Sequence, residues 1–156
     1  MRTDRLYKVA YEEAVRALSE QQSLIESFRT RAGLLFSAAA VTTFFLGAQA
    51  LRGGASNPTA WLALLCFLGV AVASLAILWP RPWEGIANPH ELIETYVESG
   101  EPAPIEDLHR DLSLYMHDSY MENQDGVEHF ALLLQLASSL LTSEVVLWIA
   151  ALAASD

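Results

Sequence analysis

Residues 32–51 (AGLLFSAAAVTTFFLGAQAL) form an apolar run without a charged side chain, and this run directly follows a segment rich in charge. About 20 helical residues cross the hydrocarbon core of a bilayer, which is roughly 30 Å thick. A helix that is apolar on every side does not suit the surface of a water-soluble domain. We therefore expect residues 32–51 to form a transmembrane helix.

Two further runs have the same character, at residues 60–79 (AWLALLCFLGVAVASLAILW) and 130–153 (FALLLQLASSLLTSEVVLWIAALA). Trp61 and Trp79 stand at the two ends of the first of these runs, where interfacial aromatic residues are common. Overall, 53% of the residues are hydrophobic, and they are concentrated in these runs. The sequence predicts an all-α membrane protein, a single domain over residues 1–156, with three transmembrane helices.

Residues 1–31 are nearly balanced in charge and carry an apolar seam with steps of four and three. The seam consists of Tyr7, Tyr11, Ala14, Leu18, Gln21, Ile25 and Phe28. This spacing predicts a helical stalk that continues without proline into the first span. The seam packs either against another helix of the chain or against a second copy. Gly33 and Ser37 extend the candidate packing face into the span, because small residues let helix backbones approach closely.

Residues 84–129 contain twelve acidic residues against one arginine, Arg110, and account for most of the net charge of −10. This balance argues against a surface that binds nucleic acid. A helix is expected from Pro89, capped by Asn88, to about Ser99. A second helix is expected to start at Ile105, to return beside the stalk, to weaken around residues 123–126 and to continue into the third span.

The distribution of basic residues predicts the orientation. Eight of the nine Lys and Arg residues lie in residues 1–31 or 81–129, and only Arg52 lies between the first two spans. By the positive-inside rule, the N-terminus and the acidic insert are cytoplasmic. Arg29 and Arg31, directly before the first span, are either topology anchors or part of a site for an anionic ligand, to which Arg16 or Arg110 would contribute.

Glu144 is the most informative single residue, because it is a carboxylate inside the third span. A charged side chain at the centre of a bilayer costs roughly 2.5–3.5 kcal/mol on insertion scales and is a functional candidate by default. It can line a pore, bind a cation or take up a proton. Alternatively, it reaches the interface or hydrogen-bonds Thr42 or Thr43. Gln135 is a second polar residue of this span and shares a face with Ser138, Ser139 and Thr142.

No enzyme or metal motif is complete. His109-Arg110-Asp111-Leu112 spells a kinase catalytic-loop string, but the other kinase motifs are missing. His90-Glu91-Leu92-Ile93-Glu94 lacks the second histidine of a zinc-binding HExxH helix. His109 and His117 stand eight residues apart, and a metal or pH role for them is weighed against ordinary polar positions. We expect no catalytic residue, no metal ligand and no cofactor.

Four segments resemble a group of small, mostly actinobacterial predicted membrane proteins without an established activity. They are residues 6–47 (LYKVAYEEAVRALSEQQSLIESFRTRAGLLFSAAAVTTFFLG), 75–99 (LAILWPRPWEGIANPHELIETYVES), 105–124 (IEDLHRDLSLYMHDSYMENQ) and 143–152 (SEVVLWIAAL). The order of helices also resembles the transmembrane effectors of bacterial antiphage systems, including Pycsar membrane effectors. That resemblance implies a homo-oligomer in the bacterial inner membrane that disrupts the membrane when a cyclic nucleotide signals infection.

These observations lead to two hypotheses. The first is an oligomeric membrane effector that permeabilises the inner membrane in an antiphage or stress pathway. The alternative is a structural or accessory membrane protein that docks a cytoplasmic partner through its acidic helical region. An enzyme has no support from the spacing of polar residues.

Overall fold

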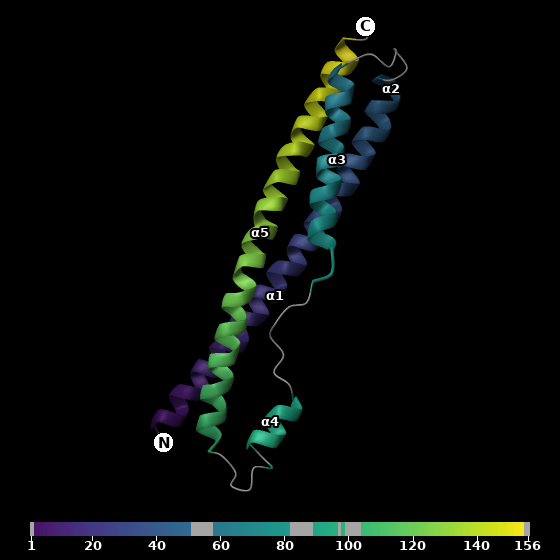
Figure 1. The fold of residues 1–156 in the computed structure, drawn as a ribbon. Coiled ribbons are helices and arrows are strands. Elements are labelled where there is room, and N and C mark those ends of the chain that lie inside the picture. Colours follow the sequence, from purple (N-terminus) through teal and green to yellow (C-terminus); the bar gives the residue numbers. More distant parts are fainter. Residues whose placement is uncertain (1, 51–57, 82–88, 97, 99–103, 155–156) are drawn as a thin grey trace. The chain divides into compact units, whose positions relative to one another are not determined.

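A computed structural model describes residues 2–50, 58–81, 89–96, 98 and 104–154, and over this part of the chain it contains helices and no strand. The helices are α1 (Arg2–Thr42), the π-helix η1 (Thr43–Gly47), α2 (Ala48–Ala50), α3 (Pro58–Leu78), α4 (Pro89–Tyr96) and α5 (Ile105–Ala153) (Figure 1). The expected all-α fold is confirmed for these residues.

Three helical segments are long and apolar enough to cross a membrane, judged by length and composition. They are Arg5–Ala50, Pro58–Leu78 and Ile105–Ala153. By these two criteria, length and composition, the prediction of three candidate spans is confirmed. The first and third segments are much longer than a bilayer requires, because each joins a polar half to an apolar half in one continuous helical run.

The chain divides into two compact units, which we describe separately. The first unit contains Met1–Leu24 and Arg81–Val127, and the second contains Ile25–Pro80 and Glu128–Asp156. Helices α1 and α5 contribute residues to both units.

In the first unit, α1 and α5 pack side by side in the same direction. The ring of Tyr11 stacks on His109 with 5.4 Å between centroids, and one and a half heptads later Gln21 Nε2 donates a hydrogen bond of 3.1 Å to the Tyr120 carbonyl oxygen. Gln21 is only 6% exposed. The seam of the N-terminal segment is therefore used here inside the chain, which is the first of the two alternatives considered from the sequence.

In the second unit, α3 packs against the apolar ends of α1 and α5 through small side chains. One cluster joins Ala39 of α1, Val70 and Ala73 of α3, and Ala137 of α5. The approach at Gly69 is close, since a Cβ placed there would lie 2.7 Å from Leu140 Cδ1. Small residues on the facing sides of the helices allow their backbones to approach this closely.

Large apolar side chains cover the outside of the second unit. The most exposed ones include Phe44, Trp79, Leu34, Leu132 and Leu65. Monomeric soluble proteins rarely expose a contiguous apolar surface of this kind. Such a surface suits contact with lipid chains.

The π-helical turn η1 was not expected from the sequence, which predicts an unbroken α-helix to Leu51. Four residues of an α-helix rotate about 40° beyond a full turn, so inward positions spaced by four drift around the helix. Ala39, Thr43 and Gly47 have this spacing, and the wider turn of η1 keeps Gly47 buried while Phe44 and Phe45 remain outside. Single π-turns inside α-helices are frequent at functional sites.

Two helix boundaries differ from the expectation. Helix α4 ends at Tyr96, and Ser99, where the sequence predicted its end, lies outside the described residues. Helix α5 continues through residues 123–126, where the sequence predicted a weak point, because Asn123 and Val127 are buried against the rest of the unit. Tertiary packing outweighs local helix propensity at such positions. Asn88, Leu51, the turn at residues 52–57 and the expected stop at Gly100 lie outside the described residues.

Candidate functional site

Glu144 is fully buried, with 0% of its surface exposed. It shares the inward face of α5 with Ala137, Trp148 and Ala151, which recur at helical spacing and are also fully buried. The carboxylate therefore points into the second unit and not toward the surrounding medium. The register of α5 places a polar group at a position that the packing pattern otherwise fills with apolar side chains.

A short chain of hydrogen bonds holds one oxygen of this carboxylate. The hydroxyl of Thr43 donates to Glu144 Oε1 at 2.6 Å, and the indole Nε1 of Trp148 donates to Thr43 Oγ1 at 3.4 Å. A hydroxyl can accept one hydrogen bond while it donates another, so Thr43 links the two side chains of α5. Hydrogen bonds in such a chain polarise one another, which strengthens the contact to the carboxylate. The bond to Thr43 is one of the alternatives that the sequence left open for Glu144.

The second oxygen has no such partner. Glu144 Oε2 is buried without a hydrogen bond, and the described residues form no ion pair with this carboxylate. Most buried polar atoms in proteins are hydrogen-bonded, so an exception requires an explanation. Cys66 of α3 lies near enough to interact electrostatically with Glu144. The site thus contains residues from η1, α3 and α5, with one acceptor left unused.

Gly47 shapes the wall beside this site. A Cβ at Gly47 would lie 3.1 Å from Cζ2 and Cη2 of Trp148, which is closer than ordinary van der Waals contact. The absence of a side chain therefore lets the indole ring approach η1 closely, with its nitrogen hydrogen-bonded to Thr43. Glu144 could be singled out from the sequence, but Trp148 and Gly47 could not be recognised as its neighbours, because the π-turn that brings them together has no sequence signature.

Gln135 is separated from this site. It lies on the outward face of α5 together with exposed hydroxyl residues, namely Ser138, Ser139, Thr142 and Ser143. Each of these hydroxyls donates to the backbone carbonyl four residues earlier, at 2.8–3.0 Å. Their hydrogen-bonding capacity is therefore satisfied within α5 itself. The two polar residues that the sequence assigned to the third span, Glu144 and Gln135, point in different directions.

The residues expected to form one packing face do not form one. Gln21, Ile25 and Phe28 are buried and Leu18 is half-buried, so they pack within the chain. Gly33, by contrast, has open space around the position of a Cβ, and Ser37 is exposed with its hydroxyl bonded to the Gly33 carbonyl oxygen at 2.9 Å. Leu18, Gln21, Ile25 and Phe28 follow one another at seam spacing, but Gly33 comes five residues after Phe28, so Gly33 and Ser37 lie off this seam.

The basic residues singled out from the sequence belong to different units. Arg110 belongs to the first unit, whereas Arg29 and Arg31 belong to the second. Arg29 is half-buried, and its Nε is buried without a hydrogen bond; Arg31 and Arg110 are exposed.

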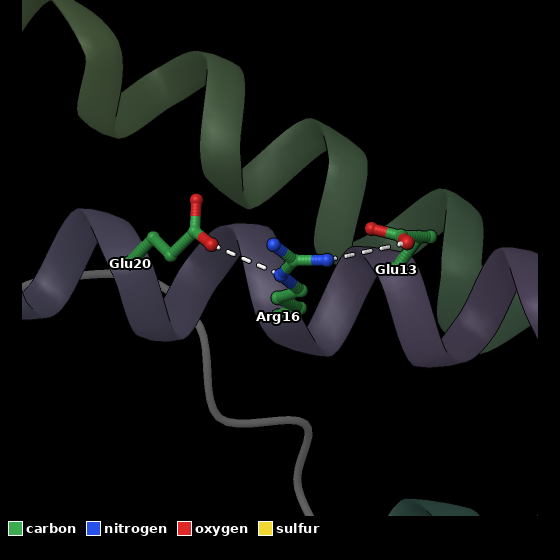
Figure 2. Close-up of polar contacts among 3 residues, drawn as sticks. All are labelled: Glu13, Arg16 and Glu20. Atoms are coloured by element: carbon green, nitrogen blue, oxygen red, sulfur yellow. Dashed lines mark hydrogen bonds and ion pairs between the residues drawn. The ribbon is translucent and has the colours of Figure 1, made fainter.

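Arg16 is engaged by acidic residues on its own helix. Its guanidinium lies 3.7 Å from Glu13 Oε1 and 3.0 Å from Glu20 Oε1, at helical spacings of three and four (Figure 2). Exposed pairs of this kind contribute roughly 0.3–0.5 kcal/mol each to stability. The two carboxylates beside the Arg16 guanidinium also oppose the approach of an anionic ligand. Arg16 is therefore a poor contributor to an anion site.

The histidines take part in local contacts. His109 stacks on Tyr11, His90 lies 3.3 Å from Glu94, and His117 is exposed. Within the described ranges, no group of three or more His, Cys, Asp or Glu side chains is arranged to hold a metal ion.

The kinase-like string of α5 takes part in packing with α4. The Tyr96 hydroxyl donates to Asp111 Oδ2 at 2.6 Å. This hydrogen bond, followed by burial and by the charges of Asp111 and Asp107, raises the pKa of Tyr96 to about 12. Asp111 is thus the acceptor in a contact between two helices of the first unit.

A hollow of about 410 Å³ lies between α1 and α5 in the first unit. Its lining consists of Ala17, Glu20, Gln21, Leu24, Tyr120, Gln124 and Val127. The one charged group in this lining, Glu20, is paired with Arg16. The hollow is mostly apolar and carries no positive charge, so it does not suit a phosphate-bearing ligand.

Comparison with protein-family models, with curated proteins and with solved structures finds no significant match to this chain. The resemblance to transmembrane effectors therefore receives no support from relatives.

Proposed function

We propose that the chain is a multi-pass protein of a bacterial inner membrane that acts as a signal-controlled effector and raises the permeability of that membrane. In this proposal the second unit spans the bilayer and the first unit lies in the cytoplasm. The protein works as a homo-oligomer and has no catalytic residue of its own. The signal is a cyclic nucleotide or a cytoplasmic protein that binds the first unit.

One observation carries this proposal, namely the continuity of α1 and α5. Both helices contribute to the polar first unit and to the apolar second unit. A helix transmits rotation and translation along its length because its backbone hydrogen bonds hold each turn to the next. A ligand that repacks α1 against α5 in the first unit would therefore alter the packing of the same helices in the second.

The apolar surface of the second unit supports the membrane location, and Arg29 and Arg31 support the orientation. Both arginines lie just before the apolar part of α1 and form no ion pair with the described residues of their unit. Basic residues at this position favour the cytoplasmic side. Anionic lipid headgroups would supply their counter-charges.

The test is solute leakage from liposomes that contain the purified protein. Release of an entrapped dye and ion conductance are measured with and without a panel of cyclic nucleotides. Leu18→Pro interrupts α1 within the first unit, because proline removes a helix hydrogen bond and costs about 3 kcal/mol. We expect this variant to lose the ligand-dependent change in leakage. Leu18→Ala, which keeps the helix, should retain it.

Liposomes that stay tight to dye and ions under every ligand would contradict the effector function. The same result would leave the membrane location intact, which protease protection of the first unit tests separately.

A second candidate function is supported by the acidic face of α5. Five exposed acidic residues of the first unit recur at steps of four, seven, four and three, which places them on one side of the helix: Asp107, Asp111, Asp118, Glu122 and Asp125. Such a face suits a basic partner in an accessory or scaffolding role. This candidate predicts a partner that binds the wild-type protein and is lost with Asp118→Asn and Glu122→Gln, with no change in membrane permeability.

A further inference from the structure

We propose that Glu144 is a proton-binding site inside the bilayer and that the proton is the species that the second unit passes across the membrane. This inference rests on the proposed effector function and specifies the permeating ion. Its starting point is the carboxylate oxygen Oε2, which is buried and has no hydrogen-bond partner. The proton is the smallest ligand that can occupy this position.

The surroundings of Glu144 favour a ligand with positive charge. A buried ionised carboxylate is costly unless it is paired and hydrogen-bonded. Here a single hydroxyl, that of Thr43, donates to Oε1, and the described residues place no cation against either oxygen. Binding of a proton at Oε2 removes the charge and leaves the hydrogen bond from Thr43 in place.

Thr43 is the neighbouring side chain that can exchange hydrogen bonds with the carboxyl group. Trp148 donates to Thr43, and Thr43 donates to Glu144. The Thr43 hydroxyl carries one hydrogen and two lone pairs, so it can donate to the carboxylate or accept from the neutral acid, whereas the indole N–H of Trp148 only donates. In the transfer step, which requires that the helices repack in the activated protein and admit water to the site, a hydronium ion from one side of the membrane gives its proton to Oε2, leaving water and the neutral acid. The acid then releases the proton to water on the other side, and no electron is exchanged.

Few other groups near Glu144 titrate. On α3 the titratable neighbour is Cys66, which interacts electrostatically with Glu144. On η1 and α5 the contacts are made by Thr43 and Trp148, which do not titrate in the physiological range. The pH response of the site is therefore expected to be that of one carboxyl group beside one thiol.

The packing around the site favours a proton over a larger solute. Trp148 is fully buried, and the close approaches at Gly47 and Gly69 bring side chains of α5 against η1 and α3. A dye or a hydrated ion would need these helices to separate. Proton transfer needs hydrogen-bonding groups and not an open pore, and intramembrane carboxylates serve as such groups in pumps and transporters.

The binding site is tested with a hydrophobic carbodiimide, which enters the bilayer and reacts with protonated carboxyl groups. The probe is added to the full-length protein in liposomes, and the modified residue is identified by mass spectrometry. We expect modification at Glu144 that decreases as the pH is raised. Glu144→Gln should abolish it, and Glu26→Gln, at an exposed position, should leave it unchanged. No modification of Glu144 at any pH would overturn the proposal.

The transport step is tested with a pH-sensitive dye inside the same liposomes. Under the conditions that activate leakage, Glu144→Gln should reduce proton flux by about 100-fold, the scale on which a positioned acid-base group contributes to proton transfer. Thr43→Ser keeps the hydroxyl and should retain the flux, whereas Thr43→Val should reduce it. Circular dichroism confirms that each variant keeps its helices.

The outcomes separate the two proposals. Leakage of a large dye that is equal in wild type and Glu144→Gln would leave the effector function standing and refute the proton as its permeating species. Liposomes that remain tight to all solutes while Glu144 is modified by the carbodiimide would refute the effector function and uphold the proton-binding site.

Discussion

Replacing Gly47 by alanine tests whether the contact between η1 and Trp148 determines the packing of the second unit. Alanine is favoured over glycine inside a helix by about 1 kcal/mol, so the substitution alone should stabilise the chain. The added methyl group, however, would lie 3.1 Å from Cζ2 and Cη2 of a ring that is fully buried. Neither atom is the end of a flexible chain, so the ring or η1 has to move.

The size of the effect follows from these two contributions. Overpacking of this kind costs about 1–3 kcal/mol. Against the helix preference, the net change for Gly47→Ala is a loss of up to about 2 kcal/mol in the free energy of unfolding. Gly33→Ala is the matched control, because a Cβ at Gly33 meets nothing within 4 Å. We expect Gly33→Ala to be stabilising by up to about 1 kcal/mol.

The assay is unfolding in mixed micelles of a mild detergent and sodium dodecyl sulfate, followed by circular dichroism. The comparison is repeated in a Trp148→Phe background, since phenylalanine lacks the part of the indole that carries Cζ2 and Cη2. In that background Gly47→Ala should lose most of its cost, and the double-mutant cycle gives the coupling energy free of the separate effects of each change.

Equal stabilisation by Gly47→Ala and Gly33→Ala would refute the contact between η1 and Trp148. So would an unchanged cost of Gly47→Ala in the Trp148→Phe background. Destabilisation by Gly33→Ala would instead show that the open face of Gly33 is covered by a second copy of the chain.

Two further predictions concern the first unit. Gln21→Ala should lower the free energy of unfolding by roughly 1 kcal/mol, because it removes the buried amide that donates to the Tyr120 carbonyl oxygen. Gln22→Ala, at an exposed position, should have little effect. Chemical denaturation measures both free energies. The stabilisation from the Tyr96 hydrogen bond should be complete below pH 10 and lost as the pH rises through about 12, because its pKa in the folded state exceeds the ordinary value of 10.0. A tyrosinate absorbance titration should show this pKa fall toward 10.0 in Asp111→Asn.

The apolar runs and the helical class could be predicted because they depend on composition summed over many residues. Helix lengths and candidate spans follow from runs such as residues 32–51, which leave no alternative structure of similar stability. The start of α4 at Pro89 was likewise predictable, because proline suits the first position of a helix.

Other features could not be predicted because they depend on the register between helices. A seam at heptad spacing does not indicate whether it packs against another part of the chain or against a second copy. At Gln21 the hydrogen bond to the Tyr120 carbonyl oxygen shows packing within the chain, and this bond can be seen only once α1 and α5 are placed side by side. The π-turn at Thr43–Gly47 could not be predicted either, because its residues are ordinary for a helix. Its effect is to change which residues of the helix face inward. Glu144 stood out by charge alone, but its partners did not.

The placement of the partners of Glu144 connects the control of the effector by the first unit with proton binding in the second. Thr43 belongs to the helical run that begins with α1, and Glu144 belongs to α5, so the central hydrogen bond of the site joins the same two helices that pair in the first unit. Helix α3 contributes Cys66 and packing but takes no part in the first unit. A rotation of α1 against α5 would therefore change the distance between Thr43 and Glu144 directly. A carboxylate held by one hydroxyl is sensitive to such a change, because loss of that single donor would leave both of its oxygens unpaired and favour entry of water or of a proton.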